Sequence, residues 1–141
     1  MASSPGQLGE AYAAAYLEQI GYRVVAANFT IPVGRNLRGA IVKAEIDLIA
    51  YDGETLCFVE VKTRSYDWFA PPQANVNLRK QRQIARAARA YRRLLGVSEQ
   101  PYRYDVITIL LTDAASPQIE LLKNFWTEDS MKKKRYWLVE N

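Results

Sequence analysis

The dipeptide Asp52-Gly53 separates two apolar runs, and it constrains the fold more than any other part of the chain. Asp-Gly between alternating apolar residues is among the strongest short-range indications of a β-hairpin. We therefore predict strands over residues 44–51 and 54–64, joined by a two-residue turn.

Ionisable side chains interrupt these otherwise apolar strands. The predicted register sets Asp47 opposite Phe58 and makes it a diagonal neighbour of Glu60, with Cα atoms roughly 7–8 Å apart. Two carboxylates at that separation can converge on one cation. Lys62 projects from the same face as Glu60, because side chains alternate along a strand. A solvated sheet face with cross-strand Glu–Lys pairs remains the alternative interpretation.

The residue types that the chain lacks limit its metal chemistry. The sequence contains no histidine, which excludes a histidine general base and histidine-ligated zinc. Cys57 is the one cysteine, so the chain can form neither an internal disulfide nor a cysteine cluster for zinc. Cys57 lies in an apolar run and is expected to be a packed core thiol. A metal site must therefore use oxygen ligands, which favours magnesium, manganese or calcium.

The pattern along the rest of the chain predicts a single α/β domain over residues 1–141, with a basic tail over about 128–141. Ser3 or Ser4 before Pro5 indicates the start of a helix that ends at Gly21. The other expected elements are a strand over 22–27, a long loop or irregular hairpin over 29–43, a loop over 65–77, a helix over 78–95, and strands over 102–112 and 119–126. The order α-β-β-β-α-β-β predicts an α/β sandwich around a mixed sheet.

The sequence shows no pattern typical of a membrane-spanning segment or a signal peptide. No apolar run approaches the ~18 residues of a membrane span, and the first residues lack a basic region followed by an apolar stretch. We expect a cytoplasmic location and no membrane partner.

Basic charge is concentrated in the helix predicted over 78–95. The net charge is +4, but residues 79–93 contain seven basic residues and no acid, which leaves −3 for the rest of the chain. Helical periodicity puts Ile84 and Tyr91 on the core face and turns Lys80 inward. The residues expected to face outward are Arg79, Arg82, Arg86, Arg89 and Arg93. These arginines and Arg64 are candidate phosphate contacts, and the alternative is a face that only improves solubility.

The two hairpin strands resemble a known signature. Glu45-Ile-Asp-Leu-Ile-Ala followed by Phe58-Val-Glu-Val-Lys-Thr-Arg64 looks like the motif of PD-(D/E)XK nucleases. More closely, the chain resembles the YraN family, uncharacterised bacterial proteins similar to archaeal Holliday-junction resolvases. The further matches are Gly9-Glu10, Gly21-Tyr22, Asn28, Lys80-Gln81-Arg82 with Ile84, Tyr104-Asp105-Val106 and Asn124-Phe125.

The resemblance implies a restriction-endonuclease-like three-layer sandwich and a magnesium or manganese site. Asp47 and Glu60 would ligate the metal together with the Val61 carbonyl, and Lys62 would position water or stabilise charge. Glu10 matches the helix acid of the resolvase-like branch, although an acid near a helix start is favourable in itself. Lys80, turned toward the sheet, would join this catalytic group.

Two departures from the family pattern concern the first strand of the hairpin. Ala44 stands where the family usually has glycine, which is expected to be harmless. Residues 29–43 form a longer link than usual, which could change the DNA shape that fits.

The sequence thus predicts a DNA-binding, magnesium-dependent endonuclease acting on branched or structured DNA, with a homodimer suggested by analogy. One rival is a nucleic-acid-binding module with a vestigial or conditional nuclease site. The other is an interaction protein whose arginines hold an acidic partner. Away from this site, Arg103 and Asp105 alternate on a strand and are expected to form a structural ion pair.

Overall fold

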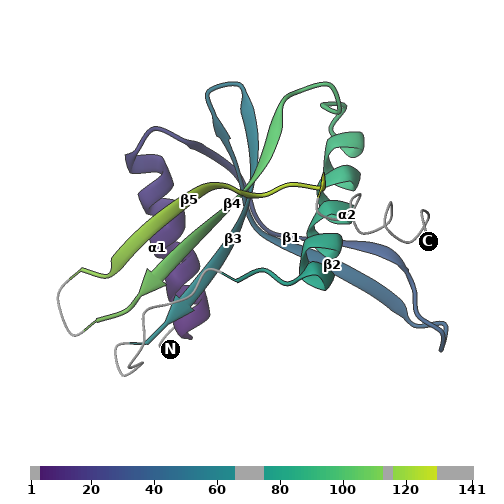
Figure 1. Cartoon of the computed structure of the whole chain (residues 1–141), viewed down its shortest axis with the longest axis horizontal. Coiled ribbons are helices and arrows are strands. Elements are labelled where there is room, and N and C mark those ends of the chain that lie inside the picture. The colour runs from purple at the N-terminus through teal and green to yellow at the C-terminus, as the bar shows by residue number, and fades with distance from the viewer. Residues whose placement is uncertain (1–3, 66–74, 113–115, 130–141) are drawn as a thin grey trace.

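Two helices and five strands follow one another in the predicted order in the computed structural model of the protein (Figure 1). The structure describes residues 4–65, 75–112 and 116–129. The elements are α1 (Pro5–Gln19), β1 (Arg23–Arg35), β2 (Ile41–Asp52), β3 (Thr55–Arg64), α2 (Leu78–Leu94), β4 (Tyr102–Leu110) and β5 (Gln118–Trp126). The basic run 132–135 lies outside the described residues, as does most of the predicted tail.

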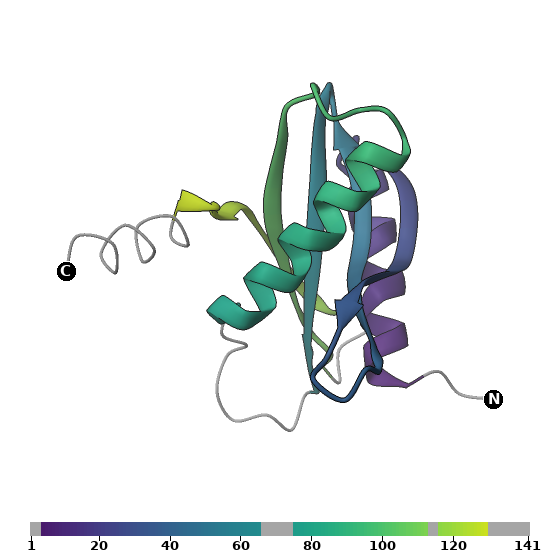
Figure 2. The same ribbon diagram turned by 90° about the vertical axis from the view of Figure 1, so that its right-hand side faces the viewer.

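The strands form one mixed sheet in the order β1-β2-β3-β4-β5. Only β3 and β4 run parallel, because α2 connects them across one face of the sheet. The turned view shows α1 and α2 on opposite faces, so the architecture has three layers (Figure 2). Within the described residues, neither helix is long and apolar enough to cross a membrane.

Each face of the sheet has its own apolar core. Phe58 lies at the centre of the α2 side, where its ring meets Tyr91 at 6.1 Å and Tyr104 at 5.9 Å between centroids. Leu17 of α1 packs over Val59 on the other side. Strand β3 therefore alternates between two buried faces, as a central strand must. Cys57 is buried on the α1 side, which confirms the predicted core thiol.

For residues 29–43 the sequence left two alternatives, a long loop or an irregular hairpin, and the loop is wrong. These residues form most of a β-hairpin, in which Thr30 pairs with Glu45 and Arg35 pairs with Ile41. Proline and glycine suggested a loop, but β1 is an edge strand, where proline can be accommodated without losing a ladder bond. Register shifts at Val24/Ala26 and between Pro32 and Gly34 absorb the irregular residues. The alternative of an irregular hairpin is the correct one.

The predicted register of the second hairpin is also wrong, by an even number of residues. Asp52 pairs with Thr55, so the turn consists of Gly53 and Glu54. Gly53 has φ +61°, a conformation that favours glycine at the first position of a two-residue turn. Counted on from Leu48↔Val59, this register sets Asp47 opposite Glu60 rather than Phe58. An even shift preserves which side chains share a face.

The strands β2 and β3 separate beyond this hairpin. Their pairing ends at Leu48 and Val59, although β2 begins at Ile41 and β3 continues to Arg64. From there β2 stays with β1, whereas β3 stays with β4. We call the divergence of residues 41–47 from residues 60–64 the fork, and Figure 1 shows its two branches running apart.

One close contact brings α1 against the fork. Gly9 is buried, and a Cβ atom built there would lie 2.0 Å from Thr63 Oγ1 and 2.9 Å from its Cβ. Rotating the threonine cannot remove the second clash, so any larger residue must move the helix. The absence of a side chain at Gly9 therefore sets how near Glu10 comes to the fork.

We predict that Gly9→Ala lowers the free energy of unfolding by about 1–3 kcal/mol, because overpacking displaces the helix. Gly6→Ala is the matched control, since a Cβ there meets nothing closer than Ser4 Oγ at 4.0 Å. That change should leave stability equal or up to about 1 kcal/mol higher. Urea unfolding followed by circular dichroism measures both, and equal midpoints for the two variants would contradict the tight packing.

Candidate functional site

Asp47 lies at the point where the fork opens. Its Oδ2 accepts a hydrogen bond of 2.8 Å from the backbone N–H of Val61. If β2 and β3 stayed paired, the Val61 N–H would donate to a backbone carbonyl of β2. The Asp47 carboxylate takes the place of that carbonyl. The N–H and C=O of one residue in an extended strand point to the same neighbour. The Val61 carbonyl therefore also faces the fork, beside Asp47.

Glu60 reaches the same point from the α2 side of the sheet. Its side chain is 8% exposed, and its Oε2 is buried with no hydrogen-bond partner among the described residues. Burial first, and then the negative charge of Asp47, raise the pKa of Glu60 to about 7. The positive charges of Lys80 and Lys62 oppose this rise in pKa. A buried carboxylate oxygen without a partner is costly, so this arrangement does not stabilise the fold.

Lys80 forms the ion pair of Glu60, with 3.9 Å between Nζ and Oε1. This contact comes from the start of α2, so the predicted inward direction of Lys80 is correct. Lys62 is half-buried on β3, near enough to Glu60 to influence its pKa. Arg64 is half-buried too, and its Nη1 donates to the Thr63 carbonyl at 2.9 Å.

Two further acids approach Asp47 from the α1 side. Carboxylate oxygens of Glu10, Glu45 and Asp47 all lie within 4.8 Å of one another. With its amide nitrogen turned toward the acids, Asn28 donates to Glu45 Oε1 at 3.0 Å and to Glu10 Oε2 at 3.0 Å. Burial and the charge of Asp47 raise the pKa of Glu10; the hydrogen bond from Asn28 opposes this rise, and Glu45 adds to it.

Glu45 and Asn28 were not among the predicted site residues. Glu45 could have been found, because it stands two residues before Asp47 on the same strand. Asn28 was noted as a family match, but its contact with the acids could not be predicted, because it involves a φ of +52° in β1 opposite Asp47. Alternation in β2 breaks at the same place: Ile46 packs on the α2 side and Leu48 on the α1 side. The interpretation of Asp47 as lying on one simple sheet face with Glu60 is therefore corrected.

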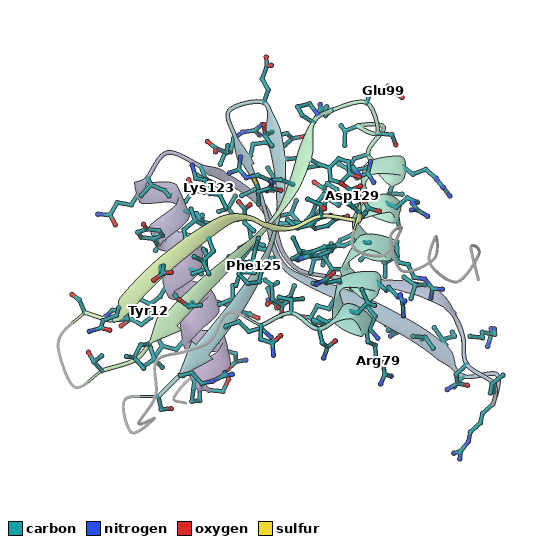
Figure 3. The ribbon with its side chains drawn as sticks, viewed as in Figure 1. Tyr12, Arg79, Glu99, Lys123, Phe125 and Asp129 are labelled. Carbon is teal, nitrogen blue, oxygen red and sulfur yellow. The ribbon has the colours of Figure 1, made fainter. Side chains whose placement is uncertain are left out.

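The helix α2 presents its arginines as predicted. The arginine face consists of Arg79, Arg82, Arg86, Arg89 and Arg93, all of which are exposed. Ile84 and Tyr91 are buried on the opposite side of the helix. Arg79 projects outward from the first turn of the helix (Figure 3). Four of these arginines line a shallow groove with Gln83, Ala85 and Glu128.

The helix sequence suggested that the arginine face has no acidic neighbour, but the structure shows one. Glu128, which follows β5, places Oε1 3.7 Å from Arg89 Nη2. Its Oε2 accepts a hydrogen bond of 2.5 Å from the Tyr102 hydroxyl, which holds the carboxylate in place. The acid comes from far along the chain, so helix periodicity could not reveal it.

The predicted ion pair on β4 is present and lies apart from the fork. Arg103 Nε donates to Asp105 Oδ1 at 2.9 Å, and its Nη2 lies 2.8 Å from Asp52 Oδ2. Asp105 is 1% exposed and also accepts from the Asn124 N–H at 2.8 Å. This buried network joins the hairpin turn to β4 and β5, which is a structural role.

Known proteins resemble most of this chain. The uncharacterised protein family UPF0102 matches residues 9–109, a range that includes the fork and the arginine face. A UPF0102 protein from Geotalea uraniireducens is 42% identical over 121 residues, covering 86% of this chain and 87% of its own. Another from Geobacter sulfurreducens is 42% identical over 119 residues, with 84% and 85% covered. One from Chlorobium limicola is 39% identical over 131 residues, with 89% and 94% covered.

The raised pKa of Glu60 predicts how the stability of the metal-free protein depends on pH. The folded protein keeps a proton that the unfolded chain releases between pH 4.5 and about pH 7. Stability therefore falls as pH rises through this window, because the folded state binds more protons. Glu60→Gln should remove about 1–3 kcal/mol of this pH dependence.

Urea unfolding in chelator, at about pH 5 and about pH 8, measures this difference. Glu54→Gln is the control, since Glu54 is an exposed carboxylate in the adjacent turn. An unchanged pH dependence in Glu60→Gln would show that Glu60 ionises normally in the folded protein.

Proposed function

This chain belongs to the uncharacterised protein family UPF0102, and we propose that its fork is the metal site of a DNA endonuclease. The single observation that carries the proposal is the buried, unpartnered Oε2 of Glu60 beside the carboxylate of Asp47. Two carboxylates that share a site resist joint ionisation unless a cation joins them. A divalent cation would relieve both the repulsion and the missing contact.

The donors at the fork suit a hard cation. Asp47, Glu60 and the Val61 carbonyl offer only oxygen, which magnesium and manganese accept. Magnesium keeps several waters and needs few protein ligands, so three donors are sufficient. A bound ion of this kind would neutralise the phosphodiester and lower the pKa of a bound water.

The surrounding side chains have distinct roles in this proposal. Lys62 extends from β3 beside Glu60 and supplies a mobile positive charge near the attacked phosphate. Lys80 pairs with Glu60 and holds its carboxylate toward the fork. Glu10, fixed by Asn28 and the close packing at Gly9, adds a negative group on the α1 side of Asp47. Glu10 thereby orients water or shares the cation.

The finer fold and substrate assignments belong to the same proposal. The three-layer α/β arrangement with a forked sheet is compatible with a restriction-endonuclease-like, PD-(D/E)XK fold. The arginine face, with Arg64, supplies phosphate contacts that position DNA. Resemblance to junction resolvases favours branched or structured DNA and a homodimer that would cut two strands.

An acidic protein partner is the second candidate, and one contact favours it. Arg89 already pairs with the carboxylate of Glu128, so the arginine face accepts carboxylates as well as phosphates. A nucleic-acid-binding protein with an inactive fork is the remaining alternative. Metal dependence of cleavage and salt dependence of DNA binding separate the three.

We predict that Glu60→Gln leaves the melting temperature in chelator equal or higher, because it removes a repulsive carboxylate. The rise in Tm on adding magnesium or manganese should shrink, since ligand stabilisation follows metal affinity. Asp47→Ala should likewise reduce metal affinity measured by titration calorimetry. Glu54→Gln serves as the control and should keep the full metal-induced rise.

Cleavage of junction, flap, single-stranded and duplex DNA with magnesium or manganese completes this test. Glu60→Gln should lose cleavage and keep DNA binding, because the arginine face is separate from the fork. If Glu60→Gln retained the full metal-induced rise in Tm, Glu60 would not be a metal ligand. Metal binding without cleavage of any substrate would favour the inactive-fork alternative.

We predict that replacing Arg82, Arg86 and Arg89 with glutamate weakens DNA binding and flattens its salt dependence. Each lost phosphate contact should reduce the slope of log K against log salt by about 0.9. The fold should persist because these side chains are exposed. Electrophoretic mobility shifts at several salt concentrations measure the effect, and unchanged affinity at low salt would return the face to a solubility role.

A further inference from the structure

The β1–β2 hairpin extends beyond the core as an arm, which we define as residues 29–46. Its base is anchored, because Phe29, Ile31 and Ile46 pack against the α2-side core. Every residue from 34 to 41 is exposed. Figures 1 and 2 both place the tip of the arm at the same end of the molecule as the start of α2 and the N-terminal end of α1. The open end of the fork points the same way (Figure 1).

The part of the arm that precedes Glu45 carries positive charge alone. Residues 29–44 contain Arg35, Arg38 and Lys43 and no acid. A projecting basic hairpin next to the arginine face extends the surface that attracts a polyanion. Two such arms facing each other would instead repel, so the charge favours nucleic acid over a second copy of this chain.

The tip presents Leu37 on a braced turn, and Ile41, at the start of β2, is 52% exposed. Leu37 is fully exposed. Asn36 Oδ1 accepts from the N–H groups of Arg38 at 2.9 Å and Ala40 at 3.0 Å, and Arg35 Nη1 donates to the Gly39 carbonyl at 2.7 Å. These bonds fix the backbone on both sides of the leucine. Proteins that kink DNA use apolar side chains on projecting elements as wedges between base steps.

The length of β2 sets the distance from wedge to fork. Ile41, at the start of β2, lies six positions before Asp47. At ~3.3 Å per residue the strand covers about 20 Å, which corresponds to roughly six base-pair steps of ~3.4 Å. An arm lying along a duplex would therefore put Leu37 several steps from a phosphate held in the fork.

We propose that the arm recognises interrupted duplex DNA by inserting Leu37 at an unstacked base step, while Arg38 and Lys43 contact the backbone. An intact duplex must be unstacked to admit the wedge, whereas a bulge or branch point is already open. The arm thus selects junctions and bulges over continuous duplex. This inference rests on the proposed function for the fork but concerns binding, so it is testable without cleavage.

The experiment compares binding of the full-length protein in chelator to three labelled DNAs: a four-way junction, a duplex with a one-nucleotide bulge, and the intact duplex. Leu37→Ser should weaken binding to the junction and the bulge about tenfold, because serine loses the apolar burial of the inserted leucine. Binding to the intact duplex should change less than about twofold. Leu94→Ser is the matched control, because Leu94 is 69% exposed at the far end of α2.

Arg38→Ser tests the backbone contact separately. It should weaken binding to all three DNAs alike and reduce the salt slope by about 0.9. Equal losses on all three DNAs for Leu37→Ser, or no loss, would overturn the wedge. A change in the sedimentation mass of Leu37→Ser would also overturn it, by showing that the tip joins two copies of the chain.

The outcome is separable from that of the proposed function. Selective loss in Leu37→Ser together with no metal-induced rise in Tm would support the arm and refute the metal site. A wild-type protein that binds metal but none of the three DNAs would refute the arm and leave the metal site standing. With magnesium present, cuts should fall at least about six base-pair steps from the bulge, because Leu37 lies beyond Ile41 in the tip. Cuts closer to the bulge would refute the placement of Leu37.

Discussion

The hydrogen bond from the Val61 N–H to Asp47 is the interaction on which the rest of the site depends. A sheet that divides exposes unpaired backbone groups, and such groups are costly when they are shielded from water. The Asp47 carboxylate satisfies one of them where the separation begins. It can do so only by lying between the two strands, which is also where carboxylates from both faces of the sheet can reach it.

The same geometry explains why negative charge accumulates at one point. Glu60 approaches from the α2 side, and Glu10 and Glu45 approach from the α1 side, so four carboxylates surround the fork. Lys80 and the Asn28 amide offset part of this charge, but the Glu60 Oε2 stays without a described partner. The site is thus arranged at a cost to the metal-free protein, as is common where residues serve function rather than stability.

The sequence predicted the order of elements, the three layers and the principal acids, and it failed where local geometry departs from regular strands. The hairpin register was two residues off, an even error that does not by itself exchange faces. Glu60 and Lys62 share a face because they are two residues apart on one strand. The alternation of β2 breaks at Asp47, opposite the positive φ of Asn28, and periodicity predicts neither departure. Pro32 and Gly34 suggested a loop because sequence does not reveal that their strand lies at an edge.

Edge position and fork together explain why an arm can exist in this fold. Once β2 leaves β3, only β1 pairs with it, and a two-stranded ribbon is marginally stable without packing on one face. Phe29, Ile31 and Ile46 provide that packing at the base, while the Asn36 bonds stabilise the far end. Asp47 lies at the root of this ribbon, so the orientation of the arm and the position of the carboxylate are set by the same backbone. A contact that moves the arm would therefore shift the Asp47 carboxylate at the fork before it affects the rest of the sheet.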